Sequence, residues 1–145
     1  MSTIFATLFM VAGMFQRTIP PPPPAISQAI AENAVVEHIG KERNLEAKKK
    51  LILTFEKDFP KSSHLPELYM ELSRTLLSQV NFPSAQQYAE KAVATVARMR
   101  SENTDPGQQK WLSSIDDSAK KNLAWVKQMV AWQDQTVRSG VLRRK

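Results

Sequence analysis

Apolar side chains recur every three to four residues along most of the chain after residue 25, which is the period of an α-helix that buries one face. Turn-forming residues divide this pattern into five segments. The predicted helices cover residues 26–40, 45–59, 64–80, 83–100 and 106–138. The usual signs of a sheet are missing, because the chain has only four Gly, two Tyr and few β-branched runs. The pattern therefore predicts an all-α fold.

The helix boundaries follow from capping and breaking residues. Gly40 is a usual residue at a helix end, and Pro60 cannot continue the second helix. Ser63 is the predicted N-cap of the third helix, which has a proline in its first turn. Asp105 and Gln108 have the spacing of a capping box, so they mark the start of the last helix.

The last predicted helix, residues 106–138, would be roughly 50 Å long, which is unusual in a globular protein. Its apolar stripe is wide, so the sequence predicts packing contacts on two sides and a far end that protrudes as a recognition surface. The stripe consists of Leu112, Ile115, Ala119, Leu123, Val126, Val130 and Val137, with Trp125, Met129 and Trp132 beside them.

Three alanines share one stripe of the fourth predicted helix, in the segment NFPSAQQYAEKAV at residues 81–93. Ala85, Ala89 and Ala92 follow one another at steps of four and three residues. A methyl group buries little apolar area, so alanine is a poor choice where hydrophobic stabilisation alone is needed. The stripe therefore predicts that a second helix comes close at this point.

The third and fourth helices together resemble the tetratricopeptide repeat (TPR), a unit of two helices with small residues at fixed positions. The matching residues are Tyr69, Leu72, Ser73, Leu76, Ala85 and Ala92, with Ala89 near the position of the family's phenylalanine. Leu76 departs from the family pattern, which has an aromatic residue there. Small residues in this family let two antiparallel helices approach closely, so the resemblance implies a tight contact between Ser73 and Ala85.

The preceding stretch, LEAKKKLILTFEKDFPKSSHLPELY, looks like the second helix of an earlier repeat, with Ala47 at the position of Ala85. Its FPKSS turn is similar to turns in bacterial cell-envelope TPR proteins, and the similarity covers about residues 26–97. The resemblance implies about two TPR-like antiparallel hairpins with a long C-terminal capping helix. Because about three repeats are normally needed for stability, a homo-oligomer is an alternative way to close the core.

Stacked hairpins of this family form a concave surface that binds peptides or partner helices. The resemblance therefore implies a protein or peptide partner and a role as a non-enzymatic scaffold. The candidate lining residues are Asn33, Tyr69, Glu71, Arg74 and Gln79, and the candidate surface continues over Trp125, Met129 and Trp132.

The net charge of +6 is concentrated near the C-terminus, since residues 1–105 carry +1 and residues 106–145 carry +5. The alternative function is a basic adaptor that contacts anionic membrane or nucleic acid, although a solvated tail is commoner and nucleic acid is the less expected partner. The basic residues at this end are Arg138, Arg143, Arg144 and Lys145. The three lysines at 48–50 and the two aspartates at 116–117 are predicted to lie on solvated helix faces.

The first 25 residues differ in character from the rest. The run at 4–15 is uncharged and apolar, and as a helix it would span roughly 18 Å, which is short for a bilayer but suits the core of a signal peptide. Export to the periplasm or cell envelope is expected. The alternative is a cytoplasmic protein whose N-terminal helix packs on the domain. The expected organisation is a leader at 1–19, a polyproline spacer at 20–25, a helical domain at 26–138 and a basic tail at 139–145.

The sequence carries little chemistry for catalysis. It has no cysteine and only two histidines, with neither a metal-binding histidine pair nor a glycine-rich phosphate loop. Ser62, Ser63 and His64 are adjacent, but a nucleophile and its base must meet in space, so helix capping is the favoured interpretation. We therefore expect no enzyme, no cofactor and no metal site.

Overall fold

The computed structural model describes residues 24–138, which form five α-helices joined by short connections. The helices are α1 (Pro24–Lys41), α2 (Leu45–Asp58), α3 (Leu65–Ser78), α4 (Phe82–Glu102) and α5 (Pro106–Arg138). No strand occurs in this range, so the predicted all-α fold is confirmed. The expected leader, most of the proline spacer and the basic tail at 139–145 lie outside the described residues.

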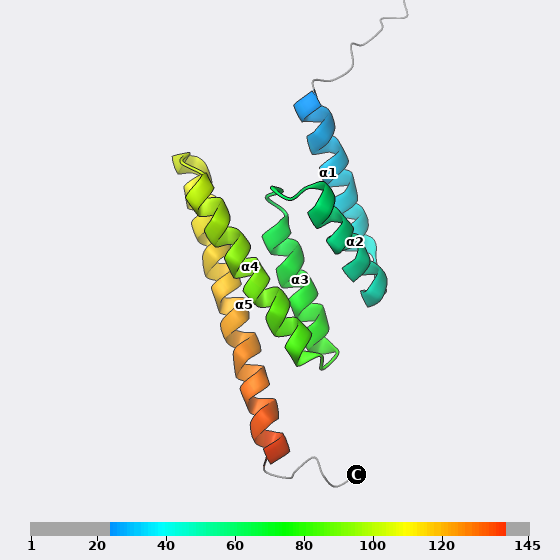
Figure 1. The fold of residues 1–145 in the computed structure, drawn as a ribbon, viewed down its shortest axis with the longest axis vertical. Coiled ribbons are helices and arrows are strands. Elements are labelled where there is room, and N and C mark those ends of the chain that lie inside the picture. The colour runs from blue at the N-terminus through cyan, green and yellow to red at the C-terminus, as the bar shows by residue number, and fades with distance from the viewer. Residues whose placement is uncertain (1–23, 139–145) are drawn as a thin grey trace, which may run out of the picture.

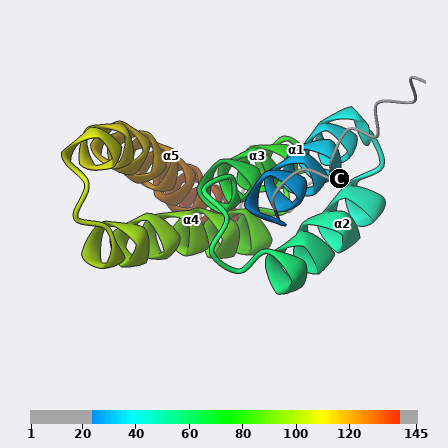
Figure 2. The ribbon, with the colours of Figure 1, turned by 90° about the horizontal axis from the view of Figure 1, so that it is seen from above.

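The helices alternate in direction, so that each one runs antiparallel to the helix before it (Figure 1). Viewed from above, α2 and α4 lie along one side of the molecule, whereas α3 and α5 lie along the other (Figure 2). The closest packing is between α3 and α4 and between α4 and α5. The pair formed by α1 and α2 joins this group through contacts of α2 with α3.

The hydrophobic core surrounds α3, which α2, α4 and α5 each cover in part. Helix α2 contributes Ile52 and Phe55 to the core, and α5 contributes Leu112, Ala119 and Val126. The α4 side of the core contains three fully buried alanines, so α4 lies closer to α3 than larger side chains would permit.

The bounds of α1 differ from the expected bounds at both ends. Pro24 and Ala25 belong to the helix and not to the spacer, since a proline in the first turn loses no helical hydrogen bond. The helix also continues through Gly40 to Lys41. The side chain of Lys41 pairs with Glu37 one turn earlier at 2.5 Å, which supports this last turn.

The prediction that Ser63 caps the third helix is wrong. Helix α3 begins at Leu65, and His64 occupies the cap position without a side-chain capping bond. The hydroxyl of Ser62 instead accepts a hydrogen bond from the backbone N–H of His64 (3.1 Å) and donates one to Glu32 of α1. Ser62 organises this turn because it is buried, whereas Ser63 is exposed.

The predicted capping box at the start of α5 is only half formed. The Asp105 carboxylate accepts hydrogen bonds from the backbone N–H groups of Gly107 and Gln108, both at 3.3 Å. The Gln108 side chain does not return to the Asp105 N–H, because it accepts a bond from the Asn103 amide. The side-chain oxygen of Asn103 accepts a hydrogen bond from the Asp105 N–H at 2.9 Å. Asn103 thus makes the contact that the capping box assigns to Gln108.

A short turn with a left-handed residue joins α3 to α4. Val80 has φ 62°, a conformation that glycine usually supplies and that costs a non-glycine residue roughly 1–2 kcal/mol. The turn is closed by hydrogen bonds from the Asn81 N–H to the Leu76 carbonyl (2.9 Å) and from the Val80 N–H to the Leu77 carbonyl (3.0 Å). The Asn81 side chain then caps α4, which fixes the two helices as an antiparallel pair.

Helix α5 is the longest element, and its bounds agree with those predicted from the sequence. Its 33 residues extend about 50 Å, whereas the 21 residues of α4 extend about 32 Å. The last turns of α5 reach beyond the ends of α3 and α4 (Figure 1). The C-terminal part of α5 therefore protrudes from the helical group, as expected.

Candidate partner-binding surface

Ser73 lies at the point where α3, α4 and α5 meet. Its hydroxyl donates a hydrogen bond to the Ala85 carbonyl (2.8 Å) and accepts one from the Asn122 side-chain amide (3.3 Å). Ser73 and Ala85 are both completely buried, and Asn122 is buried as well. The structure therefore brings Ser73 and Ala85 into the expected close contact and adds Asn122, a residue that the sequence interpretation missed.

The other residues of the proposed repeat packing also lie in the core. Leu72, Leu76, Ala89 and Ala92 are buried, and they surround the contact between α3 and α4. Ala47, the residue compared with Ala85 in the earlier hairpin, is only half-buried. The tight packing of small residues is thus concentrated in the second hairpin.

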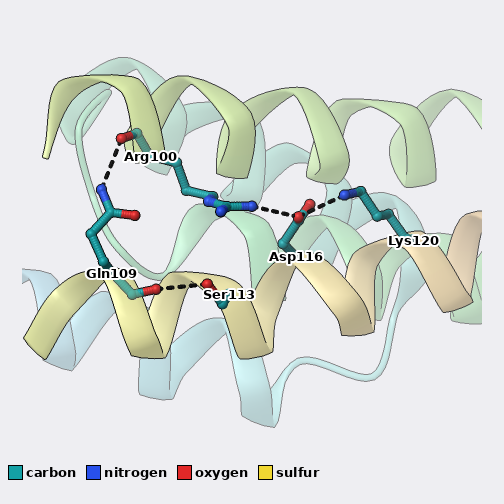
Figure 3. Close-up of polar contacts among 5 residues, drawn as sticks. All are labelled: Arg100, Gln109, Ser113, Asp116 and Lys120. Atoms are coloured by element: carbon teal, nitrogen blue, oxygen red, sulfur yellow. Dashed lines mark hydrogen bonds and ion pairs between the residues drawn. The ribbon is translucent and has the colours of Figure 1, made fainter. Parts of the chain in front are cut away.

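Asp116 holds α5 against α4, and the prediction that its side chain is solvated is wrong. Asp116 is only 5% exposed, and its carboxylate pairs with Arg100 of α4 at 2.9 Å and with Lys120 at 2.7 Å. Figure 3 shows both cations directed at this carboxylate. Nearby, the Gln109 side chain donates to the Arg100 carbonyl at 3.0 Å. Asp117, the neighbouring residue, is exposed as predicted.

Lys48 is likewise buried, so the prediction of a fully solvated lysine face is wrong at this position. The ammonium group lies 2.5 Å from the Glu71 carboxylate, and the Lys48 side chain is only 10% exposed. Lys48 is four residues before Ile52 and seven before Phe55, which places it on the buried side of α2. Glu71, expected on the partner surface, is therefore engaged with Lys48.

Tyr69 does not belong to the exposed surface, contrary to the sequence interpretation. It is 1% exposed, with its ring 6.3 Å from the Tyr88 ring and the Lys91 ammonium 4.8 Å above it. Burial is the main cause that raises the pKa of the Tyr69 phenol, and the adjacent Glu56 carboxylate adds to the increase. The phenol therefore stays neutral well above its ordinary titration range.

The remaining candidate lining residues are exposed but do not form one cluster. Arg74 of α3 donates to the Asn122 side chain of α5 at 3.4 Å. The side-chain oxygen of Asn33 in α1 lies 3.1 Å from the Nε2 atom of His64, which directly precedes α3. Gln79 is exposed at the end of α3. Only Arg74 thus adjoins the part of the candidate surface that α5 provides.

Three tryptophans form an exposed line along α5, which we call the tryptophan stripe: Trp111, Trp125 and Trp132. They are 39%, 49% and 58% exposed, and their spacing in multiples of seven residues places them on one side of the helix. Met129 is half-buried beside them. Helix α5 contacts both α4 and α3, as the wide stripe predicts, but these two helices leave the indole rings open. The sequence interpretation also missed Trp111, although its spacing from Trp125 was a usable signal.

No group of three or more potential metal-ligating side chains occurs within residues 24–138. No helix in the same range combines the length and apolarity that crossing a bilayer requires. Of the four basic residues expected to form a tail surface, only Arg138 is described, as an exposed residue in the last turn of α5, while Arg143, Arg144 and Lys145 lie outside.

Comparison of the chain with protein-family models, with curated proteins and with solved structures finds no match.

Proposed function

We propose that this protein is a non-enzymatic interaction module that docks an amphipathic helix of a partner protein on the tryptophan stripe of α5. The proposal is carried by one observation: three large aromatic side chains are exposed on one side of a helix whose neighbouring side packs tightly against α3 and α4. Indole rings bury large areas on association and are enriched in the cores of interfaces.

The spacing of the tryptophan stripe favours a helical partner. Trp132 follows Trp111 by 21 positions, so the anchors extend over about 32 Å of helix. Between Trp111 and Trp132, the exposed side chains on the same side are Ser114, Ser118, Lys121 and Gln128, of which only the lysine is charged. A long line of apolar anchors with uncharged polar neighbours suits the apolar stripe of another helix.

The rest of the domain serves as a scaffold that holds α5 in one orientation. Asp116 links α5 to α4, and Asn122 links it to Ser73 of α3. Anchors that are fixed before binding lose less conformational entropy when the partner docks. The proposal includes a TPR-like scaffold of about two hairpins capped by α5. Its support is the antiparallel pair α3–α4, with small residues between the two helices.

The proposed location of this module is the bacterial cell envelope. The support comes from the sequence alone, where the apolar run at residues 4–15 has the length of a signal-peptide core. That run lies outside the described residues. The partner is accordingly proposed to be a protein of the same compartment.

Site-specific photo-crosslinking in the cells that make the protein tests the proposal. A photoreactive residue in place of Trp125 or Trp132 should give a covalent adduct with the same partner protein. The same residue in place of Lys127, exposed on the opposite side of α5, should not. Because both tryptophans are about half exposed, the double variant Trp125→Ala/Trp132→Ala should lose binding to the purified partner, with the free energy of unfolding changed by at most about 1 kcal/mol.

Three results would contradict the proposed function. The first is the absence of adducts at positions 125 and 132. The second is an equal yield of the same adducts from position 127, which would indicate contacts without a specific surface. The third is an adduct between two copies of this chain, which would replace the partner protein by self-association.

A further inference from the structure

An open groove of about 700 Å³ is lined by residues of α2, α3 and α4. Figure 2 shows α2 and α4 on the same side of the molecule. Leu65 and Tyr69 of α3 make its buried floor. Leu53 of α2 and Ala94 of α4 add exposed apolar side chains to its lining. The groove therefore offers apolar surface between two helices, and it shares no residue with the tryptophan stripe.

The charged side chains of the groove are predominantly basic. Lys91 is already neutralised, since its ammonium lies 2.6 Å from the Glu56 carboxylate. Arg98 donates one hydrogen bond to the Pro60 carbonyl at 2.9 Å, and a guanidinium has five N–H donors. No carboxylate within residues 24–138 pairs with Arg98 or with Lys57. The lining thus carries two cations without a counter-charge.

The chain outside the described residues contains no acidic side chain that could supply the missing charge. Residues 1–23 include one arginine and neither aspartate nor glutamate. Residues 139–145 include two arginines and one lysine, again without an acid. Residues 1–23 and 139–145 thus offer these cations no acidic side chain, and the complementary charge is proposed to come from another molecule.

We propose that this groove binds an acidic peptide segment of a protein partner, with a large apolar side chain against the apolar lining that includes Leu53 and Ala94, and with carboxylates on Lys57 and Arg98. Arginine binds carboxylates through paired N–H donors, which gives such a contact its geometry. Two free cations are too few for a nucleic-acid strand, whose binding depends on many phosphate contacts. The inference does not rest on the proposed role of α5.

Fluorescence anisotropy with the full chain and a labelled synthetic peptide tests this inference. The peptide alternates pairs of glutamates with leucine or phenylalanine, and a second peptide has glutamine in place of every glutamate. We expect saturable binding of the acidic peptide and none of the glutamine peptide. The variant Lys57→Gln/Arg98→Gln should weaken binding by about tenfold or more, since charged hydrogen bonds are lost.

A matched variant separates specific binding from general attraction to a basic protein. Lys50→Gln/Lys127→Gln removes the same charge from exposed positions outside the groove, and it should weaken binding by less than about threefold. Lys57→Glu alone, at an exposed residue, provides a further measurement if the double variant is misfolded, and it should also weaken binding. No saturable binding, equal losses in the two double variants, or single-stranded RNA binding as tightly as the peptide would each overturn the proposal.

Discussion

Replacing Ala85 with leucine is expected to lower the free energy of unfolding by about 1–3 kcal/mol. Ala85 is completely buried on the α3 side of α4, and its carbonyl accepts the Ser73 hydroxyl at 2.8 Å. The additional carbon atoms must separate the two helices or force strained side-chain conformations, and either change weakens this hydrogen bond. Urea denaturation followed by circular dichroism measures the difference.

The variant Ala97→Leu is the matched control, because it makes the same chemical change at an exposed position of the same helix. Leucine and alanine have similar helix propensities, so this control should change the free energy of unfolding by no more than about 0.5 kcal/mol. Equal stabilities of the Ala85→Leu protein and the wild type would show that α3 and α4 are not closely packed at this point.

Replacing Phe55 with alanine is expected to have a larger effect, a loss of about 3–5 kcal/mol. Phe55 is 1% exposed and lies with its ring centroid 5.0 Å from that of Phe59. Ile52 and Phe55 are the buried apolar side chains that α2 adds to the core, and the Lys48–Glu71 ion pair joins α2 to α3. The loss of one of them leaves a cavity at the junction between the two halves of the molecule.

The dependence of unfolding on urea gives a second measurement for the Phe55→Ala variant. If α1 and α2 separate from the remaining helices, less surface is exposed in the main transition and the m-value falls. Leu53→Ala, at a 38% exposed position of the same helix, should cost less than about 1 kcal/mol and keep the m-value. Similar losses for the two variants would contradict the role of Phe55 as the main link.

The helices were predictable because their signals are local. The apolar period and the residues at the ends of segment 106–138 predict α5 with its observed bounds, and segment 45–59 differs from α2 by one residue. Errors arose where two neighbouring residues could fill one role. Ser62 and Ser63 are chemically equivalent, and it is Ser62, bonded to Glu32 of α1, that organises the turn before α3.

The candidate site was predicted less completely, because its side chains depend on contacts between distant segments. Nothing near Lys48 in the sequence indicates that Glu71 will neutralise it, and Asp116 is buried only because Arg100 of α4 reaches it. The family resemblance assigns Tyr69 to a position in a helix. It does not tell which side of that helix the neighbouring helices cover, so it could not show that Tyr69 is buried. The exposure of Trp125 could not be predicted from the helical spacing of the apolar residues in α5, because a buried stripe has the same spacing.

The meeting of α3, α4 and α5 at Ser73 is tested most directly by nuclear Overhauser spectroscopy of the isotope-labelled full chain. The structure predicts cross-peaks from the Ser73 β-protons to protons of Ala85 and to the side-chain amide of Asn122. The sequential cross-peaks within each helix serve as the control. If they are present and both cross-peaks of Ser73 are absent, the close packing of α3, α4 and α5 is contradicted. The fixed position of the tryptophan stripe depends on that packing.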